Sequence, residues 1–321
     1  MLAGIIDEKR KVRFLDIDEP KLDDTPGQIL FQPELACLCG SDLPYFVGQQ
    51  PEFPGTVGQS LHEMIGTVLD TTGDRFKAGD RVLCVPSHHL GLWERFVTGE
   101  ERAIALDPRA TDDEALLAQP LGTVIFAMRK LPNVLGKDVA VVGQGPMGQL
   151  FCATLRNLGA RSIIAIDKLS ERLAMSPTMG ANHVINSAEE NVVEAVAAAT
   201  GGKMADMVVE VVGHEDQVFN LCTDLSKDGG RILFFGVPPE TIDGLLWRKL
   251  FWKNIEVTTS VGPDFGIDFP LAMQWIAEGR IDVKPIITHR YPFEAIQEAF
   301  ETFVDRKEGA LKVFIDFPKI Q

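Results

Sequence analysis

Between residue 137 and about residue 259, short apolar runs alternate with segments whose apolar residues recur at a helical period. Apolar runs without polar alternation are typical of strands buried on both faces of a sheet. Strand–helix alternation with short connections predicts an α/β fold with a doubly wound parallel sheet. The expected strands are 138–142, 162–166, 183–185, 207–212 and 232–235. One expected helix follows the first strand and ends at Leu158, and three others span 169–179, 188–199 and 217–225. Pro177 is expected to end or kink the helix at 169–179.

The remainder of the chain has a different pattern. Short β-rich stretches such as 28–31 and 81–85 are separated by proline and glycine turns, and the tail ends in a strand-like run at 311–315. These features predict a β-rich catalytic domain formed by residues 1–120 and 260–321, with a nucleotide-binding domain, residues 121–259, inserted between them. Ligands usually bind in the cleft that such a junction creates.

Composition narrows the class of protein. The 321 residues are 45% hydrophobic and 24% charged, as in ordinary globular proteins. A formal net charge of −15 disfavours nucleic acid and anionic lipid as partners. The first residues form no signal peptide and no apolar run is long enough to cross a bilayer, so we expect a cytoplasmic protein without a membrane partner. Five scattered cysteines form no disulfide framework.

A glycine-rich turn marks the dinucleotide site. Residues 143–148 form a G-x-G-x-x-G motif that directly follows a predicted strand and opens a predicted helix, which is the context of a Rossmann cofactor site. The motif offers a tight turn, a close backbone approach to a pyrophosphate, close helix–sheet packing and free N–H donors at the helix start. The alternative is an ordinary glycine-rich turn. The residues predicted to bind the cofactor here are Gly143, Gly145, Pro146, Met147 and Gly148.

Cofactor choice is predicted from the end of the next strand. Asp167 stands nineteen positions after Gly148, where a carboxylate can accept both ribose hydroxyls and would repel a 2′-phosphate. NAD is therefore expected rather than NADP. Lys168 and Arg172 are nearby cations that could soften this preference, and Arg172 is also a candidate cofactor-binding residue.

A second cluster contains residues of the types that bind zinc. The run Cys39-Gly40-Ser41-Asp42 is followed, after a Pro/Gly-rich loop, by His62-Glu63. Thiolate, imidazole and carboxylate are the ligands that zinc accepts, and catalytic zinc keeps one position open. Taken alone, Cys39 would more often be a buried thiol and His62 a satisfied core histidine.

Together with His62-Glu63-x-x-Gly66 and the segment 76–82, this cluster resembles the medium-chain dehydrogenase/reductase family, in particular its zinc-dependent alcohol, polyol and sugar dehydrogenases. Gln119-Pro120-Leu121 and the C-terminal segments 288–293 and 298–300 are similar to further motifs of that branch. The resemblance covers essentially the whole chain in the family's order. It implies a GroES-like catalytic domain, an inserted Rossmann domain and one catalytic zinc.

Roles follow from this resemblance. It implies that Cys39 and His62 bind zinc, that Glu63 is a ligand or lies close behind one, and that Ser41 takes the alcohol proton. Side chains near the substrate are expected among Tyr45, Phe46, His88, His89 and Trp93, although for Tyr45 ordinary packing is an equal alternative. For the nicotinamide end of the cofactor the resemblance implies Thr123, Val212, Gly236, Val237, Ser260 and Val261.

The chain departs from the family pattern in its cysteines after the strand near Val82, at Pro44 and at Gln119. Relatives with a structural zinc carry four clustered cysteines after the strand near Val82, whereas this chain has only Cys84, so no second metal is expected. Cys37 is expected to be a core thiol. Pro44 stands where many relatives have a proton-relay histidine, so the proton must leave through Ser41 and water, the cofactor ribose or another group.

Gln119 replaces a glutamate that often serves as a zinc ligand in polyol enzymes, and it remains a candidate ligand. Because an amide is a weaker, neutral donor, we hypothesise that Glu63 coordinates zinc in the resting enzyme. Gln at this position mildly favours a sugar or polyol substrate. Asp42 is expected either to accept the free N–H of His62 or to cap the following turn.

Two rival functions remain open at this point. One is a zinc-free, NADPH-dependent enone or quinone reductase of the same superfamily, and the other is a non-catalytic dinucleotide-binding protein. The resemblance also implies a homodimer or homotetramer, and the apolar stretch 245–251 could be an interface or core.

Overall fold

The computed structural model describes residues 1–50, 53–213 and 217–318, and the chain divides into two compact units. The first unit comprises Met1–Pro120, Phe265–Glu278 and Ile287–Gln321, and the second comprises Leu121–Asp264 and Gly279–Ile286. Residues 260–264 and 279–286, which we expected in the β-rich domain, therefore group with the second unit. Buried apolar side chains at Ile281 and Ile286 anchor the latter stretch.

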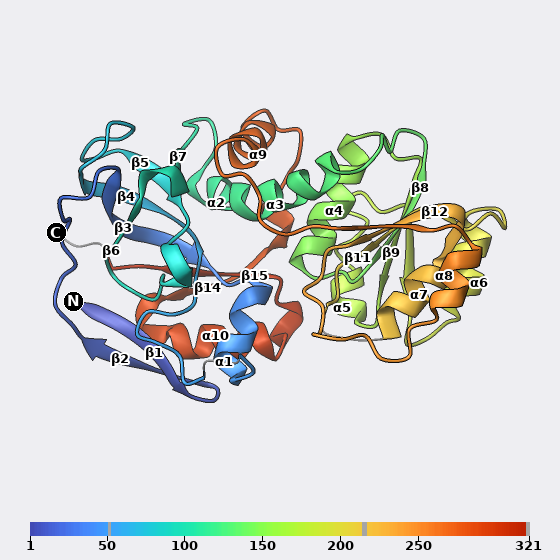
Figure 1. Ribbon diagram of the computed structural model, residues 1–321, viewed down its shortest axis with the longest axis horizontal. Helices are drawn as coiled ribbons and strands as arrows, with labels where there is room; N and C mark the ends of the chain where they lie inside the picture. The colour runs from blue at the N-terminus through green and yellow to red at the C-terminus, as the bar shows by residue number, and fades with distance from the viewer. Residues whose placement is uncertain (51–52, 214–216, 319–321) are drawn as a thin grey trace. The chain divides into compact units, whose positions relative to one another are not determined.

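The second unit is built on a six-stranded parallel sheet (Figure 1). In spatial order its strands are β10 (His183–Asn186), β9 (Ser162–Asp167), β8 (Asp138–Val142), β11 (Ala205–Glu210), β12 (Ser226–Phe234) and β13 (Glu256–Thr259). The first strand in sequence, β8, lies in the middle, and the chain proceeds outward on one side before returning to the other. This order is that of the Rossmann fold. The prediction of a doubly wound parallel sheet is confirmed.

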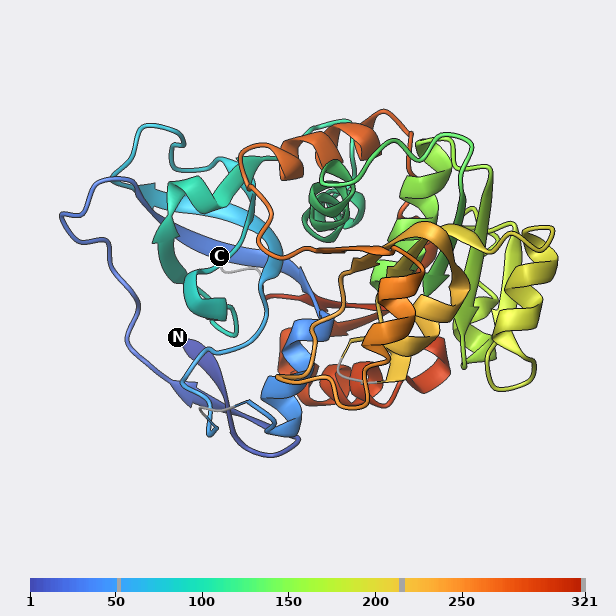
Figure 2. The same ribbon diagram turned by 45° about the vertical axis from the view of Figure 1, so that its right-hand side comes forward.

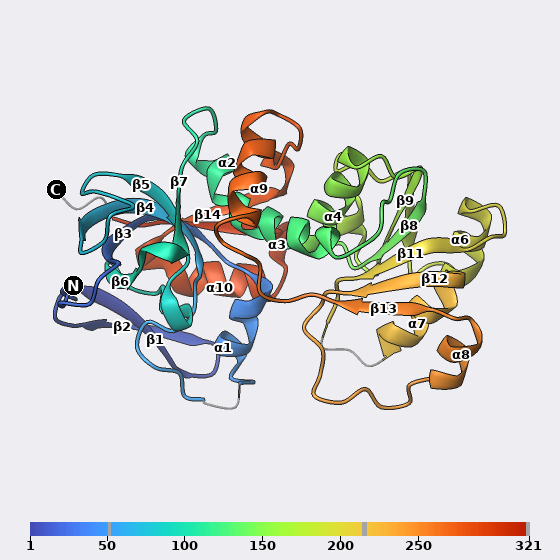
Figure 3. The same cartoon turned by 45° about the horizontal axis from the view of Figure 1, so that its top comes forward.

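Helices cover both sides of this sheet (Figures 1 and 3). They are α4 (Pro146–Asn157), α5 (Ser170–Leu173), α6 (Val192–Ala199), α7 (Gln217–Leu225) and α8 (Trp247–Trp252), and α3 (Ala118–Arg129) links the two units. Apolar side chains of α6 and α7 pack against alternate residues of β8 and β9 in one buried cluster. Burial of such a face is the main stabilising contribution to a unit of this kind.

Two local predictions need correction. The helix expected at 169–179 is only the single turn α5, and turns follow it up to Gly180, because Pro177 cannot continue a helix. The strand expected at 232–235 begins six residues earlier, at Ser226, and runs through Gly229 and Gly230. Gly229 and Gly230 therefore lie inside β12, next to the start of β11.

The first unit contains a seven-stranded, mostly antiparallel sheet and a separate hairpin (Figures 1 and 2). The sheet order is β14 (Ile287–Pro292), β15 (Lys312–Asp316), β3 (Gln28–Cys37), β4 (Glu63–Thr71), β5 (Arg81–Cys84) and β7 (Ala103–Ala105), with β6 (Phe96–Gly99) also paired to β3. The hairpin is β1 (Leu2–Glu8) with β2 (Lys11–Asp16), and the helices are α1 (Leu43–Val47), α2 (Asp112–Leu116), α9 (Asp268–Ala277) and α10 (Ile296–Val304).

Pairing within this sheet brings distant parts of the chain together. Strand β3 alternates buried and partly buried residues, so one face contributes to an apolar core that α10 also lines. Its last residue, Cys37, pairs with Glu63 of β4 on one side and with Phe314 of β15 on the other. The end of β3 is therefore the meeting point of three segments that lie far apart in sequence.

No helix in the described part of the chain combines the length and the apolar character that a bilayer crossing requires.

Candidate functional site

A sulfur, an imidazole nitrogen and a carboxylate oxygen converge at the end of β3. The ligand atoms of Cys39, His62 and Glu63 lie within 4.8 Å of one another, and no other group of three such side chains occurs among the described residues. Cys39 follows β3, whereas His62 precedes β4 and Glu63 begins it. Because β3 and β4 are neighbours, strand pairing brings the sequence-predicted Cys39 and His62 together.

Asp42 joins the two segments that carry these side chains. The carboxylate is fully buried; Oδ1 accepts hydrogen bonds from Ser60 Oγ at 2.7 Å and from Leu61 N at 2.8 Å, and Oδ2 accepts one from Cys39 N at 2.7 Å. It makes no side-chain cap to α1, and its Oδ1 lies 4.0 Å from Nδ1 of His62, too far for a direct hydrogen bond. Asp42 thus fixes the backbone on both sides of the cluster.

His62 is 8% exposed and lies in an electronegative environment. Burial disfavours its charged form, but a hydrogen bond with Cys39 and the charges of Cys39, Asp42 and Glu63 outweigh this and raise the pKa of His62 to about 9. Its Nδ1 is buried and has no hydrogen-bond partner among the described residues, while Nε2 lies 3.5 Å from Ser41 Oγ. A ring that attracts positive charge and has an unpartnered nitrogen fits a cation-binding role.

Glu63 is paired with a lysine that was not predicted from the sequence. Both side chains are 1% exposed, and the Lys312 ammonium contacts Oε2 of Glu63 directly. The same oxygen accepts a hydrogen bond from the Cys37 thiol at 2.7 Å. Burial alone would raise the pKa of Glu63, but the charge of Lys312, with smaller contributions from His62 and Cys37, holds it below its ordinary value. The sequence feature that could have indicated this pair is the position of Lys312 inside the apolar run at 311–315.

A second histidine lies against the cluster. The ring of His89, from the turn after β5, stands 4.6 Å from the ring of His62 and 6.2 Å from that of Tyr45, measured between centroids. Burial and the neighbouring charge of His62 lower the pKa of His89. Phe46, in contrast, is fully buried and stacks on Phe300 at 4.8 Å, so it belongs to the core.

The positions of three other predicted residues in this unit do not assign them a role in the site. Pro44 lies in the first turn of α1, where proline is favoured, and Tyr45 is partly buried against the core. Gln119 is 7% exposed near the start of α3. A ligand role for Gln119 and a substrate contact by Tyr45 stay predictions.

The glycine motif of the second unit forms a turn between β8 and α4. Gly143 has φ of 101°, a left-handed conformation that strains other residues, and a Cβ on Gly148 would come within 1.9 Å of the Gly143 carbonyl oxygen. Helix α4 begins at Pro146, immediately after the turn. The turn therefore has the geometry that the motif predicts, and it leads directly into the N-terminus of α4.

Asp167 is held at the carboxyl end of β9. Its Oδ2 accepts a hydrogen bond from Gln144 N at 2.7 Å, and its Oδ1 accepts one from Leu169 N at 3.0 Å. Arg172 lies on the same side, since a Cβ on Gly145 would come within 3.6 Å of the arginine Nη1. Both candidate ribose-end residues thus lie beside the glycine turn.

A buried glutamate that was not predicted from the sequence organises the loops after β11 and β12. Oε1 of Glu210 accepts hydrogen bonds from Val212 N and Gly213 N, each at 2.8 Å, and Oε2 accepts one from Gly236 N at 3.2 Å. The sequence feature that could have indicated this role is that Glu210 is the one carboxylate in the apolar run at 207–212. Of the other predicted nicotinamide-end residues, Thr123 and Ser260 are partly buried, and Val237 and Val261 are exposed.

The fold and the two sites define a class: a Rossmann unit joined to a β-rich unit with a sulfur–imidazole–carboxylate cluster. Comparison with known proteins agrees. Residues 25–107 match the family model of the alcohol dehydrogenase GroES-like domain, and residues 146–278 match that of the zinc-binding dehydrogenases. The chain belongs to the zinc-dependent medium-chain dehydrogenase/reductase family.

Individual relatives are distant but extend over almost the whole chain. Sorbitol dehydrogenase of Bacillus subtilis strain 168 is 24% identical and covers 98% of this chain and 97% of its own. L-threonine 3-dehydrogenase of Bacillus licheniformis is 27% identical, with coverages of 88% and 89%. The solved structure of alcohol dehydrogenase TADH from Thermus sp. ATN1 is 26% identical, with a TM-score of 0.88 and coverages of 99% and 100%. The names of these relatives indicate different substrates, and the solved structure shares the fold of this chain.

Proposed function

We propose that this protein is a zinc-dependent dehydrogenase that oxidises a secondary alcohol, polyol or sugar with NAD as the hydride acceptor. The observation that carries the proposal is the convergence of Cys39, His62 and Glu63 within 4.8 Å. A thiolate, an imidazole and a carboxylate form a donor set that zinc prefers, and three protein ligands leave one position for substrate. The unpartnered Nδ1 of His62 supports the fit.

Each group of the chain has a proposed role. Cys39 and His62 hold zinc, which, when bound, acts as a Lewis acid on the substrate oxygen. Ser41, whose Oγ lies 3.5 Å from His62 Nε2, accepts the proton of the substrate hydroxyl. The rigid Asp42 network keeps the cysteine and histidine segments in register, so the donors need little rearrangement when the metal binds.

Glu63 has two competing partners, the metal and Lys312. The proposal that Glu63 coordinates zinc in the resting enzyme requires the carboxylate to bind the ion while Oε2 keeps its contacts with Lys312 and Cys37. Glu63→Gln removes the negative charge with little change in volume, and zinc occupancy should fall. Elemental analysis of the purified variant and wild type measures this, and equal zinc content in the two would contradict a ligand role.

In the second unit, we propose that the glycine turn at 143–148 binds the pyrophosphate and that Asp167 binds the adenine-side ribose. The nicotinamide, when bound, accepts hydride. Both oxygens of Asp167 already accept backbone hydrogen bonds, so the carboxylate is fixed beside the turn, which supports NAD over NADP. Glu210 keeps the loops at Val212 and Gly236 in position for the nicotinamide end.

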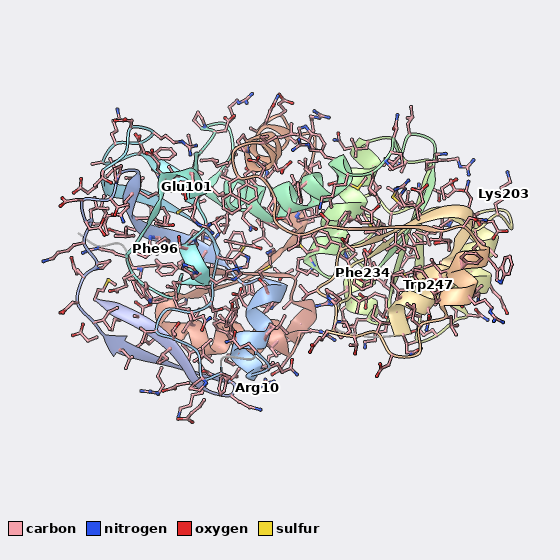
Figure 4. All side chains as sticks on the ribbon, in the orientation of Figure 1. Arg10, Phe96, Glu101, Lys203, Phe234 and Trp247 are labelled. Atoms are coloured by element: carbon pink, nitrogen blue, oxygen red, sulfur yellow. The ribbon has the colours of Figure 1, made fainter. Side chains whose placement is uncertain are left out.

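We also propose that the protein forms a homodimer or homotetramer through the β13 edge of the sheet in the second unit. Strand β13 is the last strand of the six-stranded sheet. Beside it in sequence, α8 exposes 61% of Trp247, 62% of Phe251 and 72% of Trp252, and Figure 4 labels Trp247 on this unit. An unpaired strand edge with neighbouring apolar side chains favours pairing with a second copy.

A combined metal and activity measurement tests the proposed function. Purified protein should contain one zinc ion per chain and should reduce NAD, followed by absorbance of NADH, with at least one member of a panel of secondary alcohols, polyols and aldoses. Removal of zinc by a chelator should abolish activity, and added zinc should restore it. Metal-free protein that reduces an enone or quinone with NADPH would instead establish the zinc-free reductase.

A further inference from the structure

Two histidine rings face each other beside the cluster, and only one of them has a proposed function. The rings of His62 and His89 are 4.6 Å apart with an interplanar angle of 37°, and the ring of Tyr45 is 6.2 Å from that of His89. His89 belongs to the turn after β5, whereas the proposed zinc ligands come from the ends of β3 and β4. A third segment of the first unit therefore brings a polar side chain to the site.

The backbone around both rings is strained in a coordinated way. His88 and His89 have φ of 55° and 57°, and Ser60 and Leu61 have φ of 115° and 58°. Such values are costly for residues with a Cβ and concentrate at functional sites. The two strained segments are hydrogen-bonded to each other, since Ser60 N donates to His89 O at 2.7 Å and Gly91 N donates to Ser60 O at 3.0 Å.

One ring nitrogen of His89 makes no hydrogen bond within the described part of the chain. Its Nδ1 is buried and has no partner among the described residues. An imidazole presents at least one N–H donor in either protonation state, so this capacity does not depend on pH. A buried polar atom without a partner costs stability, and a bound ligand can supply the missing hydrogen bond.

The surroundings of His89 favour a neutral ligand group. The nearby cation Arg102 is already engaged, because its Nε donates to the Val85 carbonyl oxygen at 2.8 Å and its Nη2 donates to that of Pro86 at 3.2 Å. These two guanidinium nitrogens are therefore already used and are not available to hold a carboxylate or phosphate bound at His89. A hydroxyl group needs only one donor or acceptor and matches what the imidazole offers.

We propose that His89 binds a second hydroxyl group of the substrate, next to the carbon that is oxidised, and thereby selects vicinal diols and polyols over monohydroxy alcohols. This inference rests on the proposed function, because it takes the cluster at Cys39 and His62 as the point where the reacting oxygen binds. A group held by a ring 4.6 Å from His62 belongs to the next part of the same small substrate. His89 is then a residue that determines specificity.

The test compares two substrates that differ by one hydroxyl group, (2R,3R)-butane-2,3-diol and (R)-butan-2-ol. His89→Leu introduces an apolar side chain of similar bulk that lacks both ring nitrogens. His89→Gln retains a neutral hydrogen-bonding group. His183→Leu is the matched control, because His183 is an exposed residue of β10 in the other unit. For each protein we would measure kcat/KM on both substrates, zinc content and the Kd of the diol for the zinc-loaded protein.

Wild type is expected to prefer the diol. His89→Leu should lower kcat/KM for the diol by about tenfold to a hundredfold, leave the value for butan-2-ol within about threefold, and weaken diol binding in proportion. His89→Gln should recover part of the loss, and His183→Leu should match wild type. Zinc content should be the same in all four proteins.

Three results would overturn the inference. Equal changes on both substrates would indicate a general structural role, no change would show that His89 makes no substrate contact, and loss of zinc would assign His89 to the metal. If wild type oxidises no alcohol with NAD, the proposed function fails instead. In that case the Kd of the diol, compared between wild type and His89→Leu, still decides whether His89 binds a hydroxyl group.

Discussion

The ion pair between Lys312 and Glu63 offers the most direct test of how the first unit is held together. Both side chains are 1% exposed, so solvent does not screen the interaction. Lys312→Met keeps the aliphatic length and removes the ammonium, which leaves the Glu63 carboxylate buried with the Cys37 thiol as a hydrogen-bond donor. Removing one partner of a buried pair costs about 3–5 kcal/mol, because the other charge stays uncompensated.

The free energy of unfolding of Lys312→Met should therefore fall by about 3–5 kcal/mol at pH 7, measured by urea denaturation of chelator-treated protein. Lys312→Arg keeps the charge and is the matched control, with a smaller expected loss. The double variant Lys312→Met/Glu63→Gln contains neither charge and should regain most of the difference. The coupling energy from the cycle should therefore be at least as large as the stability that the double variant regains.

The effect has a defined pH dependence. In wild type the folded pKa of Glu63 is depressed, so the stability that it contributes is present above its unfolded pKa, about 4.3, and is lost as pH falls through the lower folded value. In Lys312→Met, burial without the ammonium should raise the folded pKa of Glu63, so the carboxylate destabilises the protein at neutral pH and protonation relieves this as pH falls. The gap between the two proteins should be largest near neutral pH. It should begin to shrink as pH falls through the raised folded pKa of the variant and should shrink further below the unfolded pKa of about 4.3.

A different outcome would refute this reasoning. If Lys312→Met lost less than about 0.5 kcal/mol at pH 7, as a surface substitution does, the pair would not be a buried, desolvated interaction. A loss that did not change with pH would point to packing of the lysine stem and not to its charge.

Three further predictions concern other parts of the molecule. Cys39 is partly exposed, whereas the other four cysteines are buried and burial raises the pKa of their thiols. Iodoacetamide should therefore label only Cys39, and zinc should protect it. Labelling of any other cysteine would contradict the burial pattern. Asp167→Ser should shift the NAD/NADP ratio of kcat/KM toward NADP by about tenfold, the effect of roughly 1–2 kcal/mol of removed repulsion, and an unchanged ratio would assign the preference to another residue. Trp252→Glu should shift the mass measured by light scattering toward a monomer, and an unchanged mass would exclude α8 from the interface.

Local patterns were enough to predict much of the molecule. The parallel sheet of the second unit follows from apolar runs such as 138–142, because a strand buried on both faces must be apolar at every position. The glycine turn is also a local property, since the conformation at Gly143 and the close contact at Gly148 arise within six residues. Cys39 and His62 were predicted because their motifs resemble those of a known family, not because spacing alone brings them together.

Tertiary structure decided the environment of these groups. Lys312 and Glu63 are 249 positions apart in sequence and meet because β15 and β4 both pair with β3. His89 meets His62 because two strained turns are hydrogen-bonded to each other, and Glu210 fixes two loops that follow different strands. The sequence by itself determined which chemical groups the protein contains and which segments form strands and helices, since these depend on local periodicity. Which of those groups become neighbours, and with what charge, was decided by sheet pairing and burial, because both depend on residues that no local pattern connects.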